Sequence, residues 1–101
     1  MGTIRAISTV CPFELLRRAT TNRDRVIIYL VSQRLIGYVI DYDLNFNLLL
    51  YNVRHIGREQ QGEESVRTEC SHRLVICLGK LIRVMMRMMN PGFECALINI
   101  E

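Results

Sequence analysis

The chain has 101 residues, half of them hydrophobic, and a formal net charge of +3 at pH 7. This length allows a single domain with one modest core and excludes a multidomain architecture. The high apolar content of so small a domain predicts that part of its apolar surface contacts a partner. The mild positive charge is compatible with RNA or DNA and singles out neither.

The N-terminal residues lack the apolar segment of a signal peptide, and the longest unbroken apolar run, Val26 to Val31, is too short to span a bilayer. We therefore expect a soluble intracellular protein without a membrane partner. None of the four cysteines forms a C-x-x-C pair, and His55 and His72 show no ligand spacing. The sequence accordingly predicts no metal site and no cofactor.

Residues 1–10 show no clear pattern, and we expect a flexible N-terminus. A short helix is predicted over about residues 12–20, because Pro12 suits the first helical position and Glu14 places a negative charge in the first turn. Five strands are predicted after the helix, over residues 25–32, 35–43, 46–54, 73–78 and 81–88.

The connections between these strands differ in length. The polar stretch 55–71, with two glycines and six charges, predicts a long loop between the third and fourth strands. Gly79 and Lys80 predict a two-residue hairpin turn between the fourth and fifth strands. The tail, residues 92–101, is apolar enough to pack against the domain.

One helix followed by five strands, with a bend at Gly37 in the second, predicts a mainly β fold over residues 11–91. We expect a strongly bent five-stranded antiparallel sheet, that is, a small open barrel of SH3-like form. The strand over 81–88 is long and apolar, and an exposed edge of this kind is expected to pair with another chain. The residues expected in this interface are Leu74, Ile76, Leu78, Ile82, Val84 and Met86.

The turn between the second and third predicted strands concentrates polar side chains. It carries one carboxylate, Asp43, and two carboxamides, Asn45 and Asn47. Carboxamides offer both a donor and an acceptor, and they read the hydrogen-bonding edges of nucleic-acid bases. This turn is therefore the first candidate for a nucleic-acid contact.

These residues resemble the two motifs of the Sm and Sm-like protein family. The first motif has a glycine in a bent strand, an aromatic–Asp pair and an Asn before an apolar strand, which here are Gly37, Tyr42–Asp43 and Asn47. The second motif, Arg–Gly between two apolar strands, is matched by Leu78–Gly79. The helix, the long loop and the Asn90–Pro91 pair most resemble the D-two type of subunit in the spliceosomal Sm core.

The resemblance implies the Sm fold and a seven-membered ring of different subunits. In this family the fifth strand of each subunit pairs with the fourth strand of its neighbour, and a D-two subunit lies between D-one and F subunits. The ring encircles a uridine-rich single-stranded site in small nuclear RNA and serves pre-mRNA splicing. The implied location is the nucleus, after assembly in the cytoplasm.

The family's base pocket departs from its pattern at two of three positions. The stacking residue is here Asn45, the edge-reading residue is Asn47, and the arginine before the glycine is Leu78. Because stacking contributes about 1–3 kcal/mol per base, we expect a weak base contact and a contribution mainly to ring geometry. The residues expected to contact RNA are Asp43, Asn45, Asn47, Leu78, Gly79, Lys80 and the helix arginines Arg17 and Arg18.

Two other functions stay open. The departures in the base pocket favour an Sm-fold scaffold or assembly protein that pairs with Sm subunits without binding RNA. A subunit of an Sm-like ring in messenger RNA decay is disfavoured by the long loop and the N-terminal helix. We do not expect an enzyme, because Asp41 and Asp43 have neither a third acid nor a convergent histidine nearby in the sequence.

Overall fold

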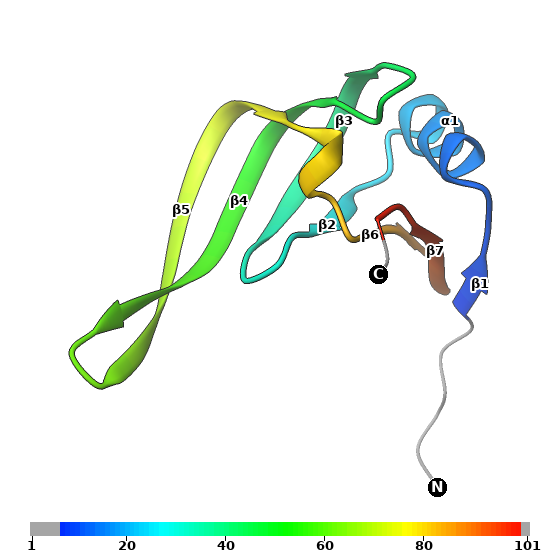
Figure 1. The fold of residues 1–101 in the computed structure, drawn as a ribbon. Coiled ribbons are helices and arrows are strands. Elements are labelled where there is room, and N and C mark those ends of the chain that lie inside the picture. Colours follow the sequence, from blue (N-terminus) through cyan, green and yellow to red (C-terminus); the bar gives the residue numbers. More distant parts are fainter. Residues whose placement is uncertain (1–6, 100–101) are drawn as a thin grey trace, which may run out of the picture.

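The computed structural model describes residues 7–99, which form one helix and one open sheet of seven strands (Figure 1). The expected count of five strands is wrong, because residues 7–9 and 92–97 add two more. The sheet has the order β1-β7-β6-β2-β3-β4-β5, so β1 and β5 are its two edges. The elements in chain order are β1 (Ile7–Thr9), α1 (Pro12–Asn22), β2 (Val26–Tyr29), β3 (Arg34–Tyr42), β4 (Leu48–Gln61), β5 (Glu64–Cys77), the 3-10 helix η1 (Gly79–Leu81), β6 (Val84–Met89) and β7 (Gly92–Leu97).

The predicted helix is confirmed and extends two residues further than expected. Pro12 occupies the start of α1, and Arg23 ends it in the left-handed conformation, with its N–H bonded to the carbonyl of Ala19. The buried face of α1, formed by Leu15, Leu16 and Ala19, packs against β3, β6 and β7. No helix in the described part of the chain is long and apolar enough to cross a membrane.

The expected bend at Gly37 is also confirmed. The register of β3 and β4 shifts between Ile36 and Tyr38 and again between Val39 and Asp41. A Cβ added at Gly37 would lie 2.9 Å from the carbonyl oxygen of Tyr51, so the close approach of β4 requires glycine there. Figure 1 shows the resulting strong curvature of β4 and β5 away from the helix.

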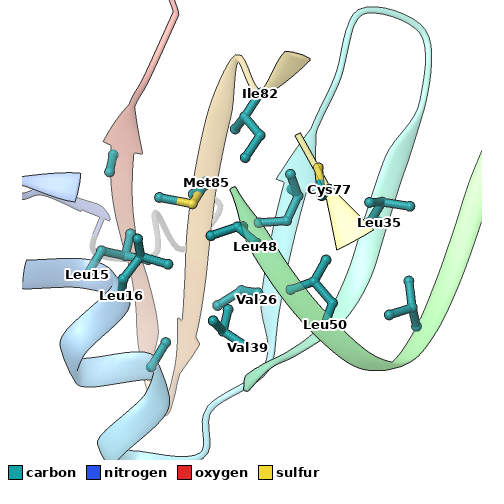
Figure 2. Close-up of a cluster of buried hydrophobic side chains, with 14 residues drawn as sticks. Leu15, Leu16, Val26, Leu35, Val39, Leu48, Leu50, Cys77, Ile82 and Met85 are labelled. Carbon is teal, nitrogen blue, oxygen red and sulfur yellow. The ribbon is translucent and has the colours of Figure 1, made fainter. Parts of the chain in front are cut away.

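The core fills the space between α1 and the bent sheet (Figure 2). Leu15 and Leu16 reach in from the helix, while Leu48, Leu50 and Met85 reach in from the strands, all at 0–1% exposure. Each such side chain contributes about 1.5–3 kcal/mol on burial. Cys77 lies in the same cluster as a small buried hydrophobe, as expected, and burial raises the pKa of its thiol.

The prediction of a loop over residues 55–71 is wrong. β4 and β5 continue through this range as an antiparallel hairpin and turn only at Gly62–Glu63, where Gln61 pairs with Glu64. Gly62 has a φ of +64°, a conformation that favours glycine and suits a two-residue turn. Most side chains of the hairpin are exposed, so no buried face marks it in the sequence.

The hairpin turn predicted at Gly79–Lys80 is wrong as well. Residues 79–81 form η1, and β6 pairs with β2 on one side and with β7 on the other. Among the described strands, β6 is therefore not the exposed edge that the sequence predicts. The edge beyond β7 is β1, which pairs in parallel with β7, so residues 7–9 of the expected flexible N-terminus belong to the sheet. Residues 1–6 lie outside the described residues.

A buried network of charges holds β7 against β6 and α1. Arg87 on β6 donates to Glu94 on β7 over 2.8 Å and also bonds to Asp24, while Arg18 on α1 reaches the other oxygen of Glu94. Glu94 is 4% exposed and Arg87 8%. The hydrogen bond from Arg87, followed by that from Arg18, lowers the pKa of Glu94 below its ordinary value.

Candidate nucleic-acid interface

Two turns that are distant in the sequence meet beside η1. One connects β3 to β4 and contains residues 43–47, and the other contains Leu78 and Gly79 at the start of η1. Gly79 is buried, and a Cβ added to it would overlap the carbonyl oxygen of Asn45. Only glycine lets the two backbones approach so closely. The sequence pattern predicted the polar turn and singled out the Leu78–Gly79 pair, and the structure brings the two segments together.

Asp43 organises the first turn. Its Oδ1 accepts the backbone N–H groups of Asn45 at 2.8 Å and Asn47 at 3.0 Å, and its Oδ2 accepts the side-chain amide of Asn47 at 2.8 Å. The hydrogen bond from the Asn47 side chain, with the two backbone donors, lowers the pKa of Asp43. Both oxygens of the carboxylate thus accept hydrogen bonds within the turn, and Asp43 does not line the adjoining pocket.

Asn47 joins the two turns through its side chain. Its Nδ2 donates to Asp43, and its Oδ1 accepts the backbone N–H of Gly79 at 2.9 Å. Both ends of this carboxamide are therefore used inside the protein. Asn45, by contrast, is exposed, and its side chain has no hydrogen-bond partner among residues 7–99. The free carboxamide of the turn is that of Asn45.

Phe46 packs toward the core. Its φ of 61° is the left-handed conformation, and its ring stacks on Phe13 of α1 with 4.5 Å between centroids. It is partly buried and contacts the core cluster. One face of its ring is thus covered by the helix.

The two turns line an open pocket of about 610 Å³. Lys80 on η1 is exposed at its rim and forms no ion pair within the described residues. Five of the eight residues expected to contact RNA line this pocket: Asn45, Asn47, Leu78, Gly79 and Lys80. The remaining lining residues are Leu44, Phe46, Ile98 and Asn99.

Asn99 is a member of this site that the sequence did not suggest. Its Nδ2 donates to the carbonyl oxygens of Gly79 and Ile82, each at 2.8 Å. These bonds fix η1 at both ends, and Asn99 itself lines the pocket. No local motif marks this residue, and the only signal was the apolar character of the tail around it.

The helix arginines do not reach this pocket. Arg17 donates to Glu14 over 3.2 Å, and Arg18 donates to Glu14 over 2.9 Å and also pairs with Glu94. Arg18 therefore belongs to the buried charge network. Neither arginine lines the pocket, so the structure separates them from the other residues expected to contact RNA.

The residues expected in a subunit interface divide into two groups. Leu74 and Ile76 lie on the edge strand β5 and are 59% and 73% exposed, and Leu78 follows them at 44%. Ile82 is fully buried in the core, which corrects its expected place on the surface. Val84 and Met86 are half-buried on β6, between β2 and β7. Only the first group is displayed at an open sheet edge.

No known protein family matches the sequence of this chain, and no curated protein matches it either.

Proposed function

We propose that this chain is a core subunit of Sm type, which assembles by strand pairing into a seven-membered ring around a uridine-rich single-stranded site of small nuclear RNA. In this role it serves pre-mRNA splicing in the nucleus, beside D-one and F types of subunit. One observation carries the proposal: the turn with Asn45 and the turn with Lys80 meet in a single open pocket. The bent five-strand section β6-β2-β3-β4-β5, preceded by a helix, supports it.

The pocket offers the chemistry that a single-stranded base needs. The free carboxamide of Asn45 can donate to and accept from the polar edge of a uracil. Leu78 supplies an apolar wall, and the unpaired ammonium of Lys80 suits a phosphate. Phe46 also lines the pocket, but Phe13 covers one face of its ring, so that face is not available to stack on a base. We therefore expect this subunit to hold its base weakly.

The edge strand β5 supports pairing with a second chain. It is 14 residues long, and only one of its sides is hydrogen-bonded, to β4. An unpaired edge of this length offers a row of backbone donors and acceptors, and the exposed Leu74 and Ile76 add apolar area. In a ring, the opposite side of the subunit pairs through β6, so we propose that a neighbour's strand there takes the place of β7.

The position of β7 favours a second candidate function. Because β7 covers β6 and is held by Glu94, the described fold presents one long open edge. A protein that pairs with Sm subunits at that edge and blocks further addition would act as a scaffold or assembly factor. This candidate differs from the first in that it needs no RNA.

Purification from native cells separates the two candidates. The tagged protein would be isolated under mild conditions, its bound RNA sequenced and its partners identified by mass spectrometry. Small nuclear RNA together with other Sm subunits is the expected result. Partners of Sm fold without RNA would contradict the ring function and support the scaffold.

A charge-matched pair of variants tests the pocket itself. Lys80→Gln and Arg58→Gln each remove one exposed cation without an ion-pair partner in the described chain, but only Lys80 lines the pocket. For the assembled ring on a uridine-rich oligonucleotide, Lys80→Gln is expected to reduce the salt dependence of log K by about 0.7, the value for one phosphate contact on a single strand. Equal effects of the two variants would place the RNA elsewhere.

A further inference from the structure

The β4–β5 hairpin brings both histidines of the chain together with a cysteine. His55 on β4 lies directly opposite Cys70 on β5, and His72 lies two residues further along β5. Side chains two residues apart on a strand share a face, so all three point to the same side of the hairpin. Their ligand atoms lie within 4.8 Å of one another. The expectation that these histidines lack ligand geometry is therefore wrong, because it treated residues 55–71 as a loop.

We propose that His55, Cys70 and His72 form a binding site for a zinc ion. The Sγ of Cys70 is already 3.2 Å from Nε2 of His72, and the two imidazole rings are 5.9 Å apart. Ligands of a tetrahedral zinc ion with ordinary bond lengths are separated by about 3.3–3.6 Å. Small rotations of the two exposed side chains, Cys70 and His72, would close the remaining difference.

The donor set selects the class of metal. Imidazole nitrogen and thiolate sulfur favour Zn²⁺ and other borderline-soft ions, whereas Mg²⁺ and Ca²⁺ require oxygen ligands. Three protein ligands leave one position of a tetrahedron open. The Oε1 of Gln33 lies 2.8 Å from Nε2 of His55, so it is placed to fill that position or to bind a water there. The side chain of Gln33 lies over Gly57 on β4, where the lack of a glycine side chain leaves room for it.

The surroundings allow a cation to enter. Cys70 and His72 are exposed, His55 is half-buried, and Cys70 is a free thiol. The charged residues next to the cluster in the sequence, Arg54, Glu69 and Arg73, alternate to the opposite face, and Arg54 pairs with Glu69. A bound metal ion would displace the thiol proton of Cys70, the contact of Cys70 with His72 and the contact of His55 with Gln33. It would cross-link β4 and β5 near the base of their exposed extension.

The test uses the reduced full-length protein and two metals, independently of any RNA or partner subunit. Zn²⁺ is titrated calorimetrically, and Co²⁺ is titrated by absorption, because a thiolate ligand gives a sulfur-to-cobalt charge-transfer band. One metal ion per chain and a charge-transfer band are expected. Cys70→Ser is expected to abolish the band, and His72→Gln to weaken zinc binding at least about tenfold, the least that loss of even a supporting residue costs at such sites.

Cys11→Ser is the matched control, since Cys11 is also an exposed free thiol but lies outside the cluster. It is expected to leave both titrations unchanged. A band that survives in Cys70→Ser, or disappears in Cys11→Ser, would overturn the site, as would the absence of zinc binding to the unaltered chain. Circular dichroism checks that each variant is folded; the proposal does not depend on the function proposed above.

Discussion

The side-chain oxygen of Asn47 accepts the backbone N–H of Gly79, with 2.9 Å between the two atoms. This bond crosses 32 residues of chain and ties the turn before β4 to the turn before β6. Because the Nδ2 of the same side chain donates to Asp43, one carboxamide sets the distance between the two walls of the pocket. Asn47 thus supports the structure of the two turns, whereas Asn45, two residues before it, is exposed to solvent.

Asn47→Ala is expected to lower the free energy of unfolding by about 1–3 kcal/mol, because it leaves the N–H of Gly79 without its partner in a buried position. Urea denaturation followed by circular dichroism measures the change. Asn45→Ala is the control in the same turn: its stability is expected to match that of the unaltered chain, while the affinity of the assembled ring for uridine-rich RNA falls. If the two alanine variants are equally stable, Asn47 does not hold the turns together.

Glu94→Gln is expected to destabilise the fold by about 3 kcal/mol, since it removes the more deeply buried of the two carboxylates that pair with the buried Arg87. Glu69→Gln removes one charge of the exposed pair with Arg54 and is expected to cost less than about 1 kcal/mol. Chemical denaturation of the two variants and the unaltered chain at neutral pH measures both changes in the free energy of unfolding. A result in which the exposed pair matters as much as the buried one would contradict the role given to the network.

Stability is expected to fall as the pH drops below about 4.5, the ordinary pKa of a glutamate. The pKa of Glu94 is lowered in the folded chain, so the folded state binds its proton less readily than the unfolded state. Its contribution is therefore complete above the unfolded pKa and is lost as the pH falls through the folded one. Thermal unfolding measured from pH 7 down to pH 3 tests this. In Glu94→Gln the decline should be shallower, and an unchanged slope would assign the acid sensitivity to other carboxylates.

Ile76→Lys is expected to reduce self-association of the isolated chain, because it places a charge on the open edge of β5, where Ile76 is 73% exposed. Analytical ultracentrifugation over a range of concentrations gives the result. Val31→Lys is the matched control: Val31 is 77% exposed but lies in the turn between β2 and β3, away from either sheet edge. Equal effects of the two lysines would mean that general solubility, and not the edge, governs association.

The parts of the fold that sequence reasoning predicted are those with a buried face. The helix has its proline start, the bend has Gly37, and the core strands have their apolar runs, so local pattern was sufficient. The hairpin over 55–71 has almost no buried side chains, and polar residues with two glycines do not distinguish an exposed ribbon from a loop. The two-residue turn at Gly62–Glu63 was the available signal.

The placement of β7 was not predictable from local pattern. It depends on pairing with β6 and on the contact of Glu94 with Arg18, which is 76 residues away in the sequence. Within the site, the polar turn and the Leu78–Gly79 pair were identified, whereas Asn99 was missed because it reaches the pocket from the tail. The cluster of His55, Cys70 and His72 was missed for the same reason as the hairpin, since His55 and Cys70 are neighbours only once the strands pair.

The position of β7, the last strand in the sequence, has a consequence for the symmetry of any assembly. With β7 and the three-residue β1 on one side, the described fold has a single long edge, and it is the same edge in every copy. Identical edges join only about a twofold axis, and such a contact closes after two chains. A ring needs two different, complementary edges on each subunit. Whether this chain forms a closed pair or a member of a larger circle is thus decided by six residues, Gly92 to Leu97.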